Sequence, residues 1–207
     1  MIDSKGVIFH GRSDLNEYKE EFATKVRITH EQAFTGADVV VGLSRPGTFS
    51  IDDIELMANN PIIFTLANPT PELFPEDIKK ARPDAIIATG RSDFPNQVNN
   101  VLGFPFIFRG ALDVKAKTIN IEMKIAAADA LAKLARQDVP EYINEAYNSK
   151  IKFGPDYIIP KPFDKRLNVE VSSAVAAAAV HTGSSSMSEF DIERYRHRLA
   201  KSICLDC

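Results

Sequence analysis

The sequence has no tryptophan and only two cysteines, Cys204 and Cys207, which lie within its last four positions. This C-x-x-C pair has no second ligand pair and no strand–helix context. We therefore interpret the cysteines as reduced thiols on a frayed end, with a metal or redox role as the alternative. No apolar run approaches the roughly 18 residues of a membrane span, and no signal peptide is visible behind Met1. We expect a cytoplasmic protein that does not contact a membrane.

An excess of positive charge is also missing. The 207 residues contain 25 Lys and Arg against 28 Asp and Glu, a formal net charge of −3. Nucleic-acid binders neutralise phosphates with basic residues, so this balance excludes a broadly basic protein of that class. With 44% hydrophobic residues, the chain is long enough to bury a sizeable core.

Several chemical signatures are absent. Neither G-x-G-x-x-G nor G-x-x-x-x-G-K-[ST] occurs, and residues 42–47 lack the paired glycine spacing that holds a pyrophosphate. There is no G-x-S-x-G elbow for a hydrolase nucleophile. The four histidines are widely separated and show no metal-ligand spacing; they are His10, His30, His181 and His197. We read Asp52 and Asp53 as N-terminal helix charges rather than a metal site.

Short apolar runs alternate with helix-forming segments, which is typical of an α/β fold with a parallel sheet and flanking helices. We predict buried strands at residues 37–42, 61–67 and 84–90. We predict helices near residues 15–22, 50–57, 75–81, 119–136, 140–149 and 167–181, and a final helix after a linker at 184–188. The second half thus ends in a C-terminal helical segment.

Three polar loops follow the predicted strands, at residues 42–47, 67–71 and 88–100. Ligands bind beyond the carboxyl ends of parallel strands, so these loops favour a binding site there. Ordinary βα turns rich in Asn and Pro are the alternative. Asn99 and Asn100 would stand at a helix N-terminus, where a carboxylate is favoured. The candidate anion partners are Arg91, Arg109, Lys161 and Arg166; for Lys161 the alternative is a solvated extended connector.

Five motifs together carry a resemblance to malic enzyme. They are D-S-K-G at 3–6 followed by G-R at 11–12, A-N-P-T-P at 67–71, A-T-G-R-S-D-F-P-N-Q-V-N-N at 88–100, F-P-F-I-F-R-G-A-L-D-V at 104–114 and I-P-K-P-F-D at 159–164. The sequence most resembles the large bacterial NADP-dependent form with a phosphotransacetylase-like C-terminal domain. The resemblance implies a Rossmann-like fold that is incomplete at its N-terminus. Residues 1–183 would be a partial NAD(P)-binding domain, and residues 184–207 a linker and terminal helix.

The resemblance also implies binding residues. Asn68 would lie near the nicotinamide ribose and malate, and Asn99 and Asn100 would hold the malate carboxylates. The implied cofactor is NADP, with NAD as the alternative. Its contacts would be Asp3, Ser4 and Lys5 beside the adenosine ribose, together with Ser44 and Asn68.

Members of this family convert malate to pyruvate and CO₂ with NAD(P) and Mg²⁺ or Mn²⁺. The glycine-rich loop, the metal-binding carboxylates and the catalytic tyrosine and lysine have no match here, so we assign no catalytic and no metal-binding residue. Lys161 does not take the catalytic lysine's part. We expect the isolated chain to be inactive and the full-length enzyme to be a homo-oligomer. The alternative is a non-catalytic module that binds a nucleotide or a partner subunit.

Overall fold

The computed structural model describes residues 1–187 and 189–203. The chain divides into two compact units, Met1–Thr89 and Gly90–Cys207. The expectation for Cys204 and Cys207 lies outside the described residues. Within the described part, no helix is both long and apolar enough to cross a membrane.

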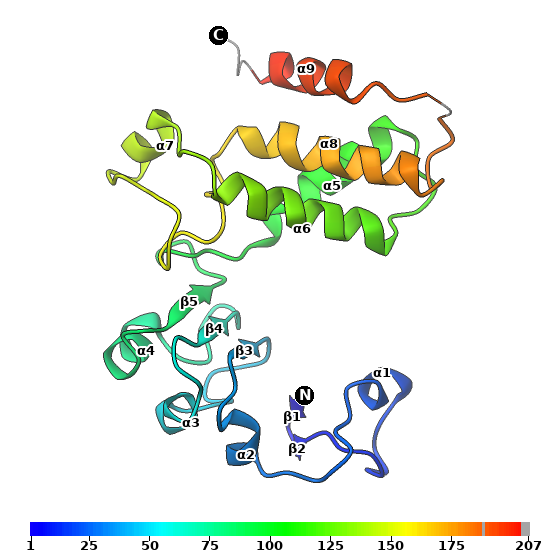
Figure 1. Cartoon of the computed structure of the whole chain (residues 1–207). Helices are drawn as coiled ribbons and strands as arrows, with labels where there is room; N and C mark the ends of the chain where they lie inside the picture. The colour runs from blue at the N-terminus through cyan, green and yellow to red at the C-terminus, as the bar shows by residue number, and fades with distance from the viewer. Residues whose placement is uncertain (188, 204–207) are drawn as a thin grey trace. The chain divides into compact units, whose positions relative to one another are not determined.

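The first unit is built on a three-stranded parallel sheet (Figure 1). Its strands are β3 (Val39–Gly42), β4 (Ile62–Thr65) and β5 (Ile86–Thr89), in the order β3-β4-β5. They pair in strict register, so that Gly42, Thr65 and Thr89 form one row at the carboxyl end. The predicted α/β fold with a parallel sheet is confirmed.

Two short helices connect these strands: α3 (Ile51–Glu55) lies between β3 and β4, and α4 (Pro75–Ala81) lies between β4 and β5. Two more, α1 (Glu17–Glu20) and α2 (His30–Phe34), precede β3. The start of α3 is fixed by a capping box in which Ser50 and Asp53 bond to each other's backbone. Asp53 therefore has the N-terminal helix role that the sequence indicated. Apolar side chains from these helices and from β4 close the core; they include Phe34, Ile54, Ile63 and Ile78.

The opening segment forms a hairpin instead of joining the parallel sheet. β1 (Ile2–Asp3) pairs antiparallel with β2 (Gly6–Val7), and the two make a separate two-stranded sheet. Gly6 has a φ of +107°, a conformation that L side chains rarely adopt, and this lets the chain reverse after only two strand residues. Asp3 thus lies at a turn, in a two-residue strand.

The second unit is helical in its described part. Its elements are η1 (Asn100–Leu102), α5 (Phe104–Asp113), α6 (Ile121–Ala135), α7 (Glu141–Ala146), α8 (Arg166–His181) and α9 (Ile192–Ser202). Helix α8 packs against α5, α6 and α9 (Figure 1). At Gly110 the two backbones of α5 and α8 approach so closely that no side chain fits between them. The core consists largely of Ala, Val and Leu.

Candidate functional site

The carboxyl end of the sheet carries two of the predicted binding residues. Ser44 lies two residues beyond β3, and Asn68 lies three residues beyond β4. Asn68 is exposed and begins a cis peptide bond to Pro69. Because β3 and β4 are parallel neighbours, their following loops leave the sheet on the same side. The structure therefore brings the Ser44 and Asn68 loops together.

A buried carboxylate joins these two loops. Glu72 is only 3% exposed. One carboxylate oxygen accepts a hydrogen bond from the Ser44 N–H at 2.9 Å, and the other accepts one from the Ala67 N–H at 3.1 Å. We call this pair of hydrogen bonds the Glu72 bridge. Sequence reasoning missed it, although Glu72 directly follows the A-N-P-T-P motif.

The hairpin carries the other predicted cofactor residues. Ser4 and Lys5 are exposed in its turn. Asp3 accepts a bidentate pair of hydrogen bonds from Arg12 at 3.0 and 3.1 Å and one from Lys19 Nζ at 2.7 Å. These hydrogen bonds hold the pKa of the Asp3 carboxyl well below its usual range.

A second carboxylate extends this cluster. Asp14 pairs with Arg12 at 2.9 Å and with Lys5 Nζ at 2.8 Å. The five side chains of the cluster carry three positive and two negative charges, so its net charge is positive. Sequence reasoning included Arg12 in the first motif without giving it a role, and it missed Lys19.

The predicted malate-binding asparagines lie in the second unit. Asn99 is the N-cap of η1, where its amide oxygen accepts the Val101 N–H at 3.0 Å. This cap uses the amide oxygen, whereas a carboxylate would be bound by the NH₂ group. Asn100 is the first residue of η1 and is exposed. Both side chains therefore stand at the start of a helical turn, as predicted.

A third asparagine of the same block is structural. Asn96 is 1% exposed; it donates to the Pro155 carbonyl at 2.7 Å and accepts from the Ile158 N–H at 2.9 Å. Lys161 donates to the Pro95 carbonyl at 2.6 Å, and burial lowers the pKa of its ammonium group. Asn96 and Lys161 thus fix the segment that precedes Asn99.

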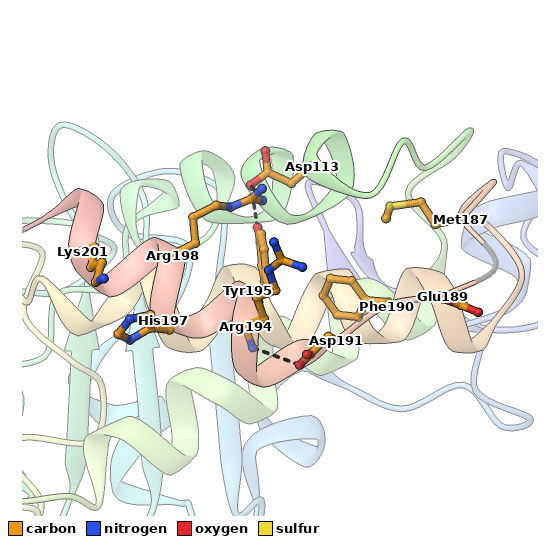
Figure 2. Close-up of a pocket in the computed structure, with 10 residues that line it drawn as sticks. All are labelled: Asp113, Met187, Glu189, Phe190, Asp191, Arg194, Tyr195, His197, Arg198 and Lys201. Carbon is orange, nitrogen blue, oxygen red and sulfur yellow. Dashed lines mark hydrogen bonds and ion pairs between the residues drawn. The ribbon is translucent and has the colours of Figure 1, made fainter.

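A cavity of about 600 Å³ lies beside α9, and none of the predicted binding residues lines it (Figure 2). One of its lining residues is Asp113, which accepts hydrogen bonds from Tyr195 Oη at 2.8 Å and from Arg109 Nε at 2.7 Å. Burial, followed by the Asp113 contact, raises the pKa of the Tyr195 phenol. Figure 2 shows Tyr195 and Arg198 pointing toward Asp113. These contacts fix α9 on α5.

The resemblance to malic enzyme implies a divalent metal ion, and the described residues offer no set of side chains that could bind it. Among residues 1–187 and 189–203, no group of three His, Cys, Asp or Glu side chains is placed to hold an ion. We therefore place no metal-dependent step on these residues.

Comparison with known proteins identifies this architecture. Residues 1–146 match the family model described as malic enzyme, NAD binding domain. The chain is 54% identical over 206 residues to the probable NADP-dependent malic enzyme of Rickettsia prowazekii. This alignment includes 98% of the present chain and 27% of that protein. It is 57% identical over 185 residues to the NADP-dependent malic enzyme of Halomonas elongata. That alignment includes 88% of the present chain and 44% of the Halomonas protein.

Solved structures agree with these relatives. The crystal structure of Entamoeba histolytica malic enzyme matches 99% of this chain and 42% of its own, with a TM-score of 0.84 and 34% identity. The chain therefore spans between about a quarter and less than half of the length of the proteins it matches. The family model covers well over half of the chain, and the chain belongs to the malic enzyme family.

Proposed function

We propose that this chain supplies the NADP-binding side and part of the malate-binding side of an NADP-dependent malic enzyme. The observation that carries the proposal is the carboxyl end of the parallel sheet, where the Glu72 bridge holds the Ser44 and Asn68 loops together. This is the edge at which doubly wound sheets bind nucleotides. The bound NADP⁺ would accept a hydride from C2 of malate.

The charge of the hairpin supports NADP over NAD. An unpaired acidic residue beside the adenosine ribose would repel a 2′-phosphate. Here Asp3 is paired with Arg12 and Lys19, and Lys5, whose side chain is 67% exposed, is paired with Asp14, so the cluster keeps one positive charge in excess. This positive surplus suits the additional phosphate of NADP.

Two features support a larger working unit. β3 is one of the two outer strands of the sheet, and its Val39 and Val41 side chains are about half exposed. An apolar strand edge of this kind favours pairing with a further strand. Phe104, Phe108 and Leu112 form an exposed apolar stripe along α5, typical of an interface. We propose that the working enzyme is a cytoplasmic homo-oligomer and that its metal ligands, acid and base come from outside this chain.

The second candidate is a non-catalytic module that binds a nucleotide or a partner subunit. The observation behind it is the exposed apolar stripe on α5, which suits a partner subunit whether or not the assembly is catalytic. Under this alternative the sheet edge would bind a nucleotide without supporting turnover.

An exchange of segments distinguishes the two functions. This chain replaces the matching stretch of the Halomonas elongata enzyme, to which it is 57% identical over 185 residues. The proposal predicts NADPH formation, followed by absorbance, that requires both malate and Mg²⁺ or Mn²⁺. It also predicts that Asn100→Ala raises KM for malate. A folded but inactive exchange enzyme that still binds NADP⁺ would favour the module.

A further inference from the structure

We propose that Glu72 is a positioning residue for the cofactor, because its carboxylate sets the spacing between the Ser44 and Asn68 loops. The inference rests on the proposed function. Glu72 itself lies beneath the loops and is 3% exposed, so it acts through them instead of touching the nucleotide.

The carboxylate group is suited to this position by its chemistry. Both partners of the side chain are backbone N–H donors, and they come from two different loops. A carboxylate can accept on both oxygens, whereas the amide of glutamine has one acceptor and one donor. Gln at position 72 would satisfy one N–H and direct its own NH₂ group at the other.

The backbone of Glu72 adds a third connection. Its carbonyl oxygen accepts a hydrogen bond from the Gly47 N–H at 3.1 Å. The loop after β3 is thus held at both Ser44 and Gly47 by a residue of the loop after β4. The backbone N–H of Ser44 is used by Glu72 and fixes the loop. The side-chain hydroxyl of Ser44 is therefore the group that can bind a ligand.

Gly42 provides the space for the bridge. A Cβ atom built on Gly42 would lie 2.5 Å from Glu72 Cδ and 2.7 Å from Oε1. Real Cβ atoms do not approach this closely. An alanine there would push the carboxylate aside, and the side chain can move only by giving up its hydrogen bonds. Gly42→Ala therefore removes the bridge while leaving the glutamate in place.

The first test measures the bridge in the full 207-residue chain by hydrogen exchange of individual amides. Gly42→Ala should increase the exchange of both the Ser44 and the Ala67 amides by about tenfold or more, and Glu72→Gln should do so for one of the two, the loss expected for a hydrogen bond to a charged group. Glu76→Gln is the matched control, because Glu76 is a nearby exposed glutamate at the start of α4. It should leave both amides unchanged.

The second test measures cofactor kinetics in the segment-exchange enzyme. Glu72→Gln and Gly42→Ala should each raise KM for NADP⁺ about tenfold and change kcat by less than about threefold. Glu72→Asp should raise KM for NADP⁺ less than Glu72→Gln does, because aspartate keeps two acceptor oxygens. In a Glu72→Ala background, Gly42→Ala should have no further effect, since the atoms it would strike are gone.

Each outcome has a separate meaning. Faster amide exchange with an unchanged KM for NADP⁺ would overturn the positioning role, and unchanged exchange would overturn the bridge itself. Additive effects of Gly42→Ala and Glu72→Ala would also contradict the inference. An exchange enzyme that is inactive with the native Glu72 would count against the proposed function, while the amide measurements would still decide whether the bridge exists.

Discussion

Gly110 provides a sharp test of the helical packing in the second unit. In an isolated helix, Gly→Ala is stabilising by roughly 1 kcal/mol because alanine loses less conformational entropy. In this structure, a Cβ at position 110 would overlap the Ser172 carbonyl oxygen and lie 3.0 Å from Val175 Cβ. Overpacking of this kind costs about 1–3 kcal/mol, and a backbone oxygen cannot move aside as a flexible side chain can.

A clash with backbone belongs at the upper end of that range, about 2–3 kcal/mol. We therefore expect Gly110→Ala to lower the free energy of unfolding by about 1–2 kcal/mol after the propensity gain of roughly 1 kcal/mol is subtracted. Urea unfolding followed by far-UV circular dichroism measures it. The control is Gly103→Ala, because a Cβ there would make two ordinary contacts, with Ile107 Cδ1 at 3.5 Å and with the Asn100 carbonyl oxygen at 3.9 Å. A Gly110→Ala protein as stable as the parent chain would refute the close approach of α5 and α8.

Three further predictions concern charge and titration. Asp164→Ala should lower the free energy of unfolding, measured in urea, by about 3 kcal/mol, because it leaves the half-buried Arg166 without its carboxylate partner at 2.7 Å. The control is Asp156→Ala, which should change that free energy little because Asp156 is exposed. Burial raises the pKa of Tyr157 from its ordinary value of about 10 to about 12. The unfolded chain therefore loses this proton at lower pH than the folded chain, and the contribution of Tyr157 to the free energy of unfolding is complete below pH 10. Between pH 10 and 12 that free energy falls by about 1.4 kcal/mol per pH unit. An ultraviolet titration should show a phenolate step near pH 12 that disappears in Tyr157→Phe. In the exchange enzyme, Lys5→Ala should reduce the preference for NADP⁺ over NAD⁺ about fivefold in steady-state kinetics, as for loss of one exposed charge pair; an unchanged preference would exclude Lys5 from the 2′-phosphate site.

The sequence was informative wherever a local pattern decides the structure. The β-branched runs at 39–42, 62–65 and 86–89 became the three parallel strands, and Ser50 capped a helix as its position before two acids indicated. The helix expected near Asn100 is divided. Gly103 ends η1, and Pro105 in the first turn begins α5, because proline has no N–H to continue the earlier helix.

The sequence was silent on contacts between distant residues. The Glu72 bridge joins residues 28 positions apart, and nothing local distinguishes Glu72 from a solvent-exposed glutamate in a turn. The pairing of Asp3 with Arg12 and Lys19 likewise depends on how the hairpin and α1 fold together. The domain boundary at residue 183 stays a prediction, as do the ligand roles of Ser44 and the three binding asparagines.

The most direct test of the central claim is the hydrogen-exchange footprint of NADP⁺ on the segment-exchange enzyme. The account predicts slower amide exchange within residues 3–6, 43–47 and 67–70 when NADP⁺ is bound, and no change along α9. Protection beside α9, or an unchanged exchange rate in the loops joined by Glu72, would contradict the assignment of the cofactor to the carboxyl edge of this sheet.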